Sequence, residues 1–285
     1  MVPALAEVER FVAMGTRIEL HRFGPGDADA LAAARRAIEA VDDALTIHRP
    51  SMTTALNEKL MSGQDASIDD PVLFEALVAI DQAYSATLGL FDPAADRRFA
   101  SVGWSDIIFD RATARIAATR PVAFDFGGIG KGIALDRACD ALRSAGVGSA
   151  CLSAGESSIA VIGDHPLGGG WPFAIPDPLQ TGQMLVELEL HDESLSISSA
   201  VGAGMLAPER AAMIRPGDGA VVMDARCAVA IDRQGARAEA MSTALIVSDD
   251  ARAASLVGER PKHRFLFDLS HTAAMPAPAA GMQVQ

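Results

Sequence analysis

The sequence predicts an α+β fold in which mixed sheets pack against helices. Helical segments and short antiparallel-type strands follow one another without the regular alternation of a parallel α/β fold. Hydrophobic residues make up 49% and charged residues 21% of the 285 residues, so the chain can bury a sizeable core. We see no internal repeat and no clear linker. We therefore expect one domain over residues 1–285, with a frayed tail from about residue 270.

The first part of the chain predicts a β-hairpin and a helix. Residues 8–24 alternate between apolar and polar side chains, which is typical of a strand or hairpin. Residues 26–47 are rich in alanine, glutamate and arginine, so they predict a helix. Asp27 is the residue that we expect to cap this helix.

A second helix is predicted over residues 69–89. Asp70 stands at the cap position, Pro71 in the first turn and Gly89 just past the end, and each residue type is favoured where it stands. Residues 106–128 follow as short β-type runs around a turn.

The second half of the chain predicts further helices and many short strands. Apolar residues at spacings of three and four predict one face of a helix that ends at Gly146: Leu135, Ala138, Cys139 and Leu142. From residue 149 to about 232 the chain consists mostly of short apolar runs between turn residues, which read as strands. Residues 236–248 and 249–257 predict two more helices.

The charge of the chain limits its partners. The formal net charge is −13 and the pI is about 4.8, whereas nucleic acids and anionic membranes attract basic surfaces. No stretch approaches about 18 uninterrupted apolar residues. We therefore expect neither nucleic-acid binding nor membrane insertion.

The expected compartment is the cytoplasm. The N-terminal residues MVPALAEVERF are too short and too charged for a signal peptide, so a periplasmic location would require that a leader has been removed. Cys139, Cys151 and Cys227 are odd in number and widely spaced, which suggests neither a disulfide framework nor a zinc site. We expect them to be small buried hydrophobic side chains.

Residues 127–132 pack four glycines and Lys131 in front of the third predicted helix. Glycine lets the backbone approach an anion, free amides at a helix start point toward it, and Lys131 adds positive charge. The same glycines would also serve a tight turn without a ligand, and the residues alone leave both interpretations open. The stretch matches neither a Walker loop, which has Ser or Thr after the lysine, nor the dinucleotide pattern G-x-G-x-x-G.

Six ordered motifs give the chain a resemblance to a known family. They are AMGT (13–16), HRPSMTTALN (48–57), TLGLFDPA (87–94), DFGGIGKGIALD (125–136), SAGESSIAVIG (153–163) with WPFAIPDP (171–178), and AEAMSTAL (238–245). In this order they resemble the ApbE family, the FAD:protein FMN transferases once described as thiamine-biosynthesis lipoproteins. The likeness covers most of the chain.

The resemblance implies a T-fold-related α+β fold and a concrete reaction. Family members bind FAD with Mg²⁺ at its pyrophosphate and cleave it with release of AMP. They pass FMN to a Thr or Ser hydroxyl of a target flavoprotein, or to water in some members. We therefore expect a magnesium-dependent FAD:protein FMN transferase, with FAD as substrate, Mg²⁺ as cofactor and an unidentified acceptor flavoprotein as partner. Such phosphoryl transfer depends mainly on positioning and charge neutralisation.

The resemblance also assigns site residues. The metal ligands would be the backbone carbonyl of Gly128, the side chain of Glu239 and the hydroxyl of Thr243, and the last two are also the expected catalytic residues. Oxygen ligands suit Mg²⁺, and the spacing of four residues would point both side chains the same way on a helix. The positions that match family residues around the flavin nucleotide are Met14, Gly15, Thr16, Asn57, Gly127, Gly128, Lys131 and Asp136.

Two departures from the family pattern bear on the activity. The family usually has Asp where Glu239 stands, so the carboxylate arm here is one methylene longer. The family motif H-I-I-D-P-x-T-G has its best equivalent at residues 212–219, where Ala212 replaces the histidine and Arg215 the aspartate. A histidine can take a proton from an accepting hydroxyl, and alanine cannot. Two alternatives therefore stay open: a flavin-binding protein without transferase activity, and an FAD pyrophosphatase.

Each of these residues also has a purely structural interpretation. Glu239 would be an exposed acid and Thr243 a helix-packing residue, while Lys131 would be a solvated lysine at a helix start. Asn57 would cap a helix or satisfy a turn. For residues 91–93 we favour a structural corner over a catalytic role.

Overall fold

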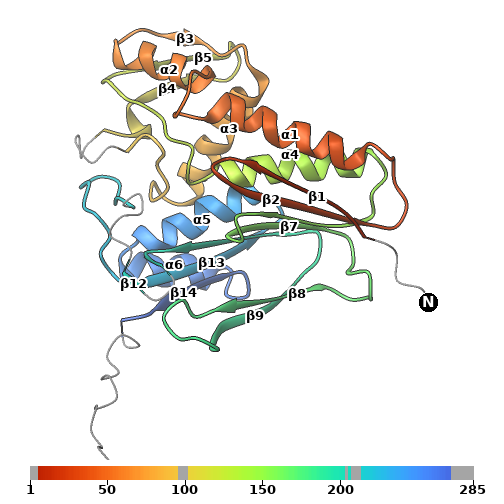
Figure 1. The fold of residues 1–285 in the computed structure, drawn as a ribbon. Helices are drawn as coiled ribbons and strands as arrows, with labels where there is room; N and C mark the ends of the chain where they lie inside the picture. The colour runs from red at the N-terminus through yellow and green to blue at the C-terminus, as the bar shows by residue number, and fades with distance from the viewer. Residues whose placement is uncertain (1–5, 96–101, 203–204, 207–212, 271–285) are drawn as a thin grey trace, which may run out of the picture.

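The computed structural model describes residues 6–95, 102–202, 205–206 and 213–270, and it confirms the predicted α+β class (Figure 1). The helices are α1 (Ala30–Leu45), α2 (Met52–Met61), α3 (Pro71–Ala86), α4 (Gly130–Ser144), α5 (Gly235–Val247) and α6 (Asp250–Glu259), with a short 3-10 turn at Trp104–Asp106. The strands are β1 (Ala6–Ala13), β2 (Thr16–Phe23), β3 (Ala66–Ser67), β4 (Ile107–Asp110), β5 (Arg115–Ala118), β6 (Ser149–Ala154), β7 (Ser158–Ile162), β8 (Trp171–Pro176), β9 (Met184–Leu190), β10 (Ser194–Ser199), β11 (Val201–Gly202), β12 (Met205–Leu206), β13 (Arg226–Asp232) and β14 (Arg264–Asp268).

A central antiparallel sheet organises the molecule. Among the described residues it has seven strands in the order β1-β2-β6-β7-β10-β13-β14. Helices α1, α4 and α5 lie on one face of this sheet, and the hairpin of β8 and β9 lies on the other (Figure 1).

The two faces of the sheet carry two separate cores because successive strand residues point in opposite directions. In β7, Ala160 and Ile162 belong to the large core under the helices, whereas Val161 between them packs with Trp171 and Leu190 of the β8–β9 hairpin. Burial on both faces explains why β7 and β13 read as nearly continuous apolar runs rather than alternating ones.

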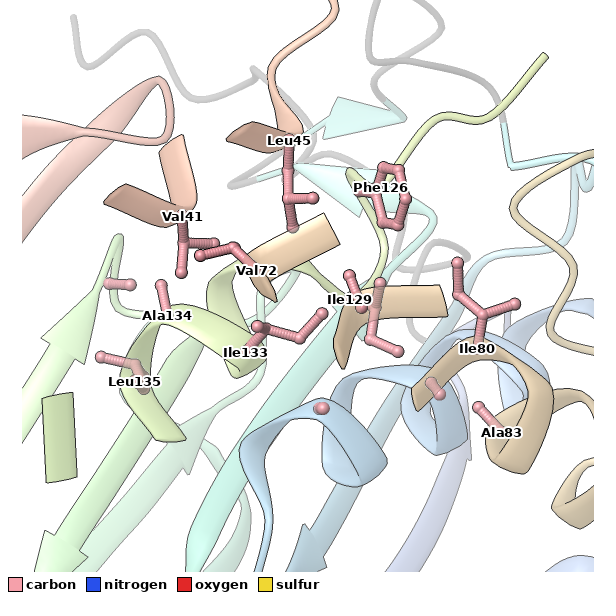
Figure 2. Close-up of a cluster of buried hydrophobic side chains, with 14 of the residues drawn as sticks. Val41, Leu45, Val72, Ile80, Ala83, Phe126, Ile129, Ile133, Ala134 and Leu135 are labelled. Atoms are coloured by element: carbon pink, nitrogen blue, oxygen red, sulfur yellow. The ribbon is translucent and has the colours of Figure 1, made fainter. Parts of the chain in front are cut away.

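The large core also anchors the glycine-rich turn. Figure 2 shows Phe126 and Ile129 of the turn among side chains from other elements, including Leu45 of α1 and Ile80 of α3. Phe126 is 3% exposed and Ile129 is fully buried. Apolar packing therefore fixes the turn, in which Gly127 is exposed and Gly128 half-buried, whereas Gly130 and Gly132 are buried.

A small layer of short strands and helices stands beside this core. The strands β3, β5 and β4 form a three-stranded antiparallel sheet in that order. Trp104 links this layer to the main core, because its ring lies 5.8 Å from that of Phe124 and its indole N–H donates to Asp81 Oδ1 at 3.2 Å.

Most of the expected elements are confirmed. Asp70 caps α3 by accepting from the Leu73 N–H at 2.8 Å, Pro71 is the first helical residue, and Gly89 has the positive φ of 78° expected past a helix end. The tail beyond residue 270 lies outside the described residues.

The predicted cap of the first helix is wrong. Helix α1 begins at Ala30 with Asp29 at its N-cap position, and Asp27 instead accepts the Asp29 N–H at 3.0 Å. Asp27 therefore closes a local turn before the helix, a bond that aspartate side chains readily form and that competes with capping.

All three cysteines are free thiols; Cys139 and Cys227 are buried as the sequence predicts, whereas Cys151 is only half-buried, which corrects the prediction at that position. Burial raises the pKa of Cys139 and of Cys227 to about 12 and that of Cys151 to about 11. Within the described ranges, no helix combines the length and apolar character needed to cross a membrane.

Candidate functional site

The glycine-rich turn leads into α4 with alternating burial. Phe124 and Phe126 are buried, whereas Asp125 and Gly127 are exposed. Asp125 is tied to the corner at residues 91–93, because its N–H donates to the Pro93 carbonyl at 2.9 Å. The alternation presents a carboxylate and bare backbone to the outside at the start of a helix.

Most amides of this turn already have acceptors within the chain. The bonds are Gly127 N–H to Asp125 Oδ1 at 2.8 Å, Ile129 N–H and Gly130 N–H to the Phe126 carbonyl at 3.0 and 2.7 Å, and Gly132 N–H to Glu239 Oε2 at 2.8 Å. The expectation of a row of free amides is therefore wrong at these four positions. The tight-turn interpretation accounts for three of the bonds, and a carboxylate from a distant helix accounts for the fourth.

Glu239 is the most buried charged residue of the site. Its side chain is 4% exposed and has three donors: the Gly132 N–H on Oε2, and on Oε1 the Ser158 hydroxyl at 2.5 Å and Lys131 Nζ at 2.9 Å. The exposed-acid interpretation of Glu239 is therefore wrong. Lys131, with a side chain 23% exposed, is not a freely solvated lysine but the ion-pair partner of this carboxylate.

Two glycines allow helices α4 and α5 to come this close. A Cβ added at Gly132 would lie 2.3 Å from the carbonyl carbon of Gly235, and one added at Gly235 would lie 2.9 Å from the Gly132 carbonyl oxygen. The backbones of the two helix starts thus touch directly. This contact brings Lys131, near the start of α4, to Glu239, one turn into α5.

Asp136 fixes the start of α5 from the neighbouring helix. Its carboxylate accepts the Gly235 N–H at 2.6 Å and the Ala236 N–H at 3.0 Å. It therefore acts as the N-cap that the residue before α5 does not supply, because Gln234 makes no side-chain cap bond. Burial raises the pKa of Asp136 to about 6, and the nearby carboxylates of Asp140 and Glu239 add to that effect.

Asn57 holds the loop that enters the glycine turn. Its side-chain amide donates to the Phe124 carbonyl at 2.9 Å, and its Oδ1 accepts the Phe124 N–H at 2.8 Å. This pair of bonds replaces the partners that a neighbouring strand would give the loop. The structural interpretation of Asn57 is confirmed, and it positions the turn from α2.

Five of the predicted residues line one cavity of about 420 Å³, a size typical of small-molecule sites. They are Gly127, Gly128, Lys131, Glu239 and Thr243. Thr243 Oγ1 lies 3.6 Å from the position that a Cβ on Gly128 would occupy, so the hydroxyl and the glycine backbone are close neighbours. Phe91 packs on the same glycine, its Cε2 lying 3.2 Å from that position.

A second cavity of about 180 Å³ lies against the same glycine turn, because Asp125, Gly127 and Lys131 line both. Met14 and Gly15 line this second cavity. They form the two-residue turn between β1 and β2, where both have positive φ values, 55° and 67°. Their placement agrees with the predicted binding region.

Thr16, Asn57 and Asp136 are the predicted site residues that line neither cavity. Thr16 packs against Gly155, where an added Cβ would lie 2.3 Å from Thr16 Oγ1. The carboxylate of Asp136 is occupied by the start of α5.

The charge of the larger cavity is predominantly negative. Asp92, Asp125 and Glu239 contribute carboxyl groups, and among the described lining residues only Lys131 carries a positive charge. Asp92 is largely structural: burial raises its pKa, and it accepts the Trp104 N–H at 2.9 Å and the Ala94 N–H at 2.9 Å. The structural corner at residues 91–93 is thus confirmed.

Sequence reasoning missed the hydroxyl groups that strand β10 brings to the cavity. Ser196 and Ser198 line it, and their hydroxyls lie 3.0 and 2.8 Å from that of Ser242 on α5. The spacing of two in SLSISS was a signal that they share one face of a strand. Ser158, which holds Glu239, gave no such signal, since only the pairing of β7 with β10 brings it there.

Arg215 lies in the hairpin beside the cavity without lining it. Its Nη1 is 3.2 Å from Asp218 Oδ2, and the neighbouring Met213, Ile214 and Pro216 line the cavity instead. Ala212 lies outside the described residues. Among the described residues, the cavity included, no cluster of three or more His, Cys, Asp or Glu side chains is arranged to hold a metal.

Comparisons with known proteins point in one direction. Residues 94–267 match the family model described as the ApbE family. A curated protein of Rhodobacter capsulatus, named FAD:protein FMN transferase, is 28% identical over 207 residues, which are 63% of this chain and 39% of that protein. The chain thus spans about two fifths of the length of that relative.

Solved structures share the fold over nearly the whole chain. The ApbE protein of Thermotoga maritima superposes with a TM-score of 0.78 at 19% identity, covering 93% of this chain and 94% of that chain. The flavin transferase ApbE of Vibrio cholerae gives 0.78 at 17% identity, covering 94% and 98%, and the flavinyl transferase ApbE of Pseudomonas stutzeri gives 0.77 at 20%, covering 92% and 91%. These likenesses confirm the predicted fold.

Proposed function

Since the chain belongs to the ApbE family, we propose that it is a magnesium-dependent FAD:protein FMN transferase. The observation that carries the proposal is the convergence of Gly128, Lys131, Glu239 and Thr243 on one cavity. FAD is the proposed substrate and an unidentified flavoprotein the proposed acceptor. The cytoplasm is the proposed compartment.

The donor set of the cavity suits Mg²⁺. The Gly128 carbonyl, the Glu239 carboxylate and the Thr243 hydroxyl are hard oxygen donors, which Mg²⁺ prefers. Among the described residues, Gly132 supplies the one donor to Glu239 Oε2, so this carboxylate retains lone pairs for an ion. The excess of carboxyl groups over ammonium groups in the cavity also favours a cation where an anionic diphosphate is to bind. When bound, Mg²⁺ would neutralise charge on the diphosphate.

The residues of the chain supply positioning and charge. Lys131 would place an ammonium group at the diphosphate, and Gly127 and Gly128 would let it approach the backbone. The acceptor hydroxyl oxygen would form a bond to the FMN-side phosphorus, and the bond from that phosphorus to the bridging oxygen would break. AMP would leave with the bridging oxygen, and the hydroxyl proton would pass to a base.

The test is incubation of the protein with FAD, Mg²⁺ and candidate acceptor flavoproteins, with AMP measured by chromatography and acceptor mass by mass spectrometry. We expect AMP and an acceptor that carries FMN. Glu239→Gln and Thr243→Val should each lower AMP release about 100-fold or more. Glu187→Gln, at an exposed position of β9, is the matched control and should leave AMP release unchanged. If no AMP forms with any divalent ion tested, the proposal is wrong.

The altered H-I-I-D-P-x-T-G segment motivates a second candidate, a flavin-binding protein without transfer. A guanidinium accepts no proton, and Arg215 pairs with Asp218 rather than lining the cavity, so it does not replace the family carboxylate there. Under this alternative FAD binds without AMP release, and Ala212→His with Arg215→Asp restores activity. Free FMN with AMP would instead identify an FAD pyrophosphatase.

A further inference from the structure

The Lys131–Glu239 ion pair is the feature of the cavity that the proposed reaction does not by itself explain. Lys131 Nζ lies 2.9 Å from Glu239 Oε1, and the Ser158 hydroxyl lies 2.5 Å from the same oxygen. One carboxylate oxygen therefore already holds a cation and a hydrogen-bond donor. The same carboxylate and the same lysine are the groups proposed to serve a metal ion and a diphosphate.

We propose that Lys131 is an internal counter-ion of Glu239 that competes with a divalent cation for this carboxylate and releases it when an anionic substrate draws the ammonium away. The inference rests on the proposed metal site. It assigns Lys131 two alternative partners, Glu239 in the empty cavity and the diphosphate in the filled one. Metal affinity and dinucleotide affinity would then be coupled through one side chain.

The burial of the pair makes the competition strong. The Glu239 side chain is 4% exposed and that of Lys131 is 23% exposed, so water screens their attraction less than it would at the surface. A buried carboxylate that loses one cation is destabilised unless another cation takes its place. Lys131 therefore stabilises Glu239 in the absence of an ion and opposes the entry of one.

The length of Glu239 is what allows this contact. Its carboxylate reaches from α5 to Lys131 and to the Gly132 amide on α4. An aspartate at this position would be one methylene shorter and would fall short of both groups if the helices stayed in place. The helices are held in place by the Gly132–Gly235 backbone contact and by the Asp136 cap. Glu239→Asp is therefore a direct way to remove the pairing while keeping both charges.

The other charged groups that face the pair do not replace Lys131. Asp136 on α4 is near Glu239, but its carboxylate is bound to the amides of Gly235 and Ala236. Asp92 and Asp125 line the same cavity and add negative charge. Removal of Lys131 should therefore leave a cavity that attracts divalent cations more strongly.

The experiment measures Mg²⁺ and Mn²⁺ binding to the FAD-free protein by isothermal titration calorimetry. Lys131→Met should bind the ion about tenfold more tightly than the wild type. Lys262→Met removes the same charge from an exposed position and should leave the affinity within about twofold of the wild type, because surface charges are screened. Equal affinities in Lys131→Met and Lys262→Met would overturn the proposal.

A double-mutant cycle separates direct pairing from the general field of the lysine. In the Glu239→Asp background, Lys131→Met should change metal affinity by less than about threefold, because the shorter side chain does not pair with Lys131. An equal effect of Lys131→Met in both backgrounds would show that the contact plays no part. Thermal melts establish that each variant is folded.

A structure provides a readout that needs no variant. Crystals of the wild type soaked in Mn²⁺ should show an anomalous peak at Glu239 and Thr243, with Lys131 Nζ turned away from Glu239 Oε1. A bound ion with the 2.9 Å contact intact would contradict the inference. The AMP assay tests the transferase proposal independently. If the metal affinities change as predicted but no AMP is released, this inference is supported and the transferase proposal is wrong. If AMP is released but Lys131→Met binds the ion as the wild type does, the transferase proposal is supported and this inference is wrong.

Discussion

Gly132→Ala is the sharpest test of how the site is assembled, because two physical effects predict opposite signs. Gly132 lies in α4, where alanine is intrinsically better than glycine by about 1 kcal/mol. An added Cβ would, however, lie 2.3 Å from the Gly235 carbonyl carbon, 2.4 Å from its oxygen and 2.5 Å from the Ala236 nitrogen. Helix propensity therefore predicts stabilisation, and the helix contact predicts the reverse.

The contact should dominate because all three neighbouring atoms are backbone atoms. A side chain would rotate away, but here α4 and α5 must separate. Overpacking of a core typically costs about 1–3 kcal/mol, and a clash with rigid backbone belongs at the upper end. After subtracting the propensity gain, we expect the free energy of unfolding to fall by about 2 kcal/mol.

The assay is equilibrium unfolding in urea, with the midpoint compared at constant slope. Gly258→Ala is the matched control, since Gly258 is also helical, in α6, and an added Cβ would meet nothing within 4 Å. This control should gain about 0.5–1 kcal/mol. Separation of the helices would also move Glu239 on α5 away from the Gly128 backbone that precedes α4, so the proposed ligands would no longer converge and Gly132→Ala should lose AMP release. A Gly132→Ala protein as stable as the wild type would refute the reasoning.

Three further perturbations test other parts of the structure. Asn57→Ala removes both hydrogen bonds to the Phe124 backbone and should lower the free energy of unfolding, measured in urea, by about 2 kcal/mol. Asn57→Asp keeps the acceptor and should be intermediate, so equal stability of the wild type and both variants would contradict this role. Asp136 has a folded pKa of about 6, above its ordinary value of 3.8, so its contribution to stability is present below pH 4 and lost as pH rises through 6. The free energy of unfolding of Asp136→Asn, relative to that of the wild type, should therefore rise by about 2–3 kcal/mol between pH 4 and pH 7. A difference between the two proteins that does not change with pH would be inconsistent with the raised pKa. Burial raises the pKa of the Cys139 and Cys227 thiols to about 12, so a thiol reagent at pH 8 should react with these two quickly only after urea is added, whereas Cys151 is half-buried. Rapid reaction of Cys139 or Cys227 in the folded protein would contradict their burial.

Local patterns in the chain were sufficient to place most elements. The α3 signals at Asp70, Pro71 and Gly89 act within one or two turns, so neighbouring residues suffice to predict them. Local patterns could not predict the cap of α5. Its acceptor is Asp136, about 100 residues earlier in the chain, and only the packing of α4 on α5 brings the two together.

The candidate site shows the same division. Ordered motifs indicated Gly127, Gly128, Lys131, Glu239 and Thr243, and the structure places all five around one cavity. Motifs did not reveal what each group does there. Asn57 matches a family position but supports a loop, because its two amide atoms are both used by Phe124.

The sequence by itself determined the α+β class, most of the elements other than α2 and β3, and the residues around the glycine-rich turn, because periodicity, caps and glycine positions are properties of short segments. Only the tertiary structure decided that the Gly132 amide binds Glu239 rather than remaining free, and that Lys131 pairs with the same carboxylate. These contacts join groups more than 100 residues apart. They depend on a helix–helix approach that two glycines permit, and no local pattern encodes that approach.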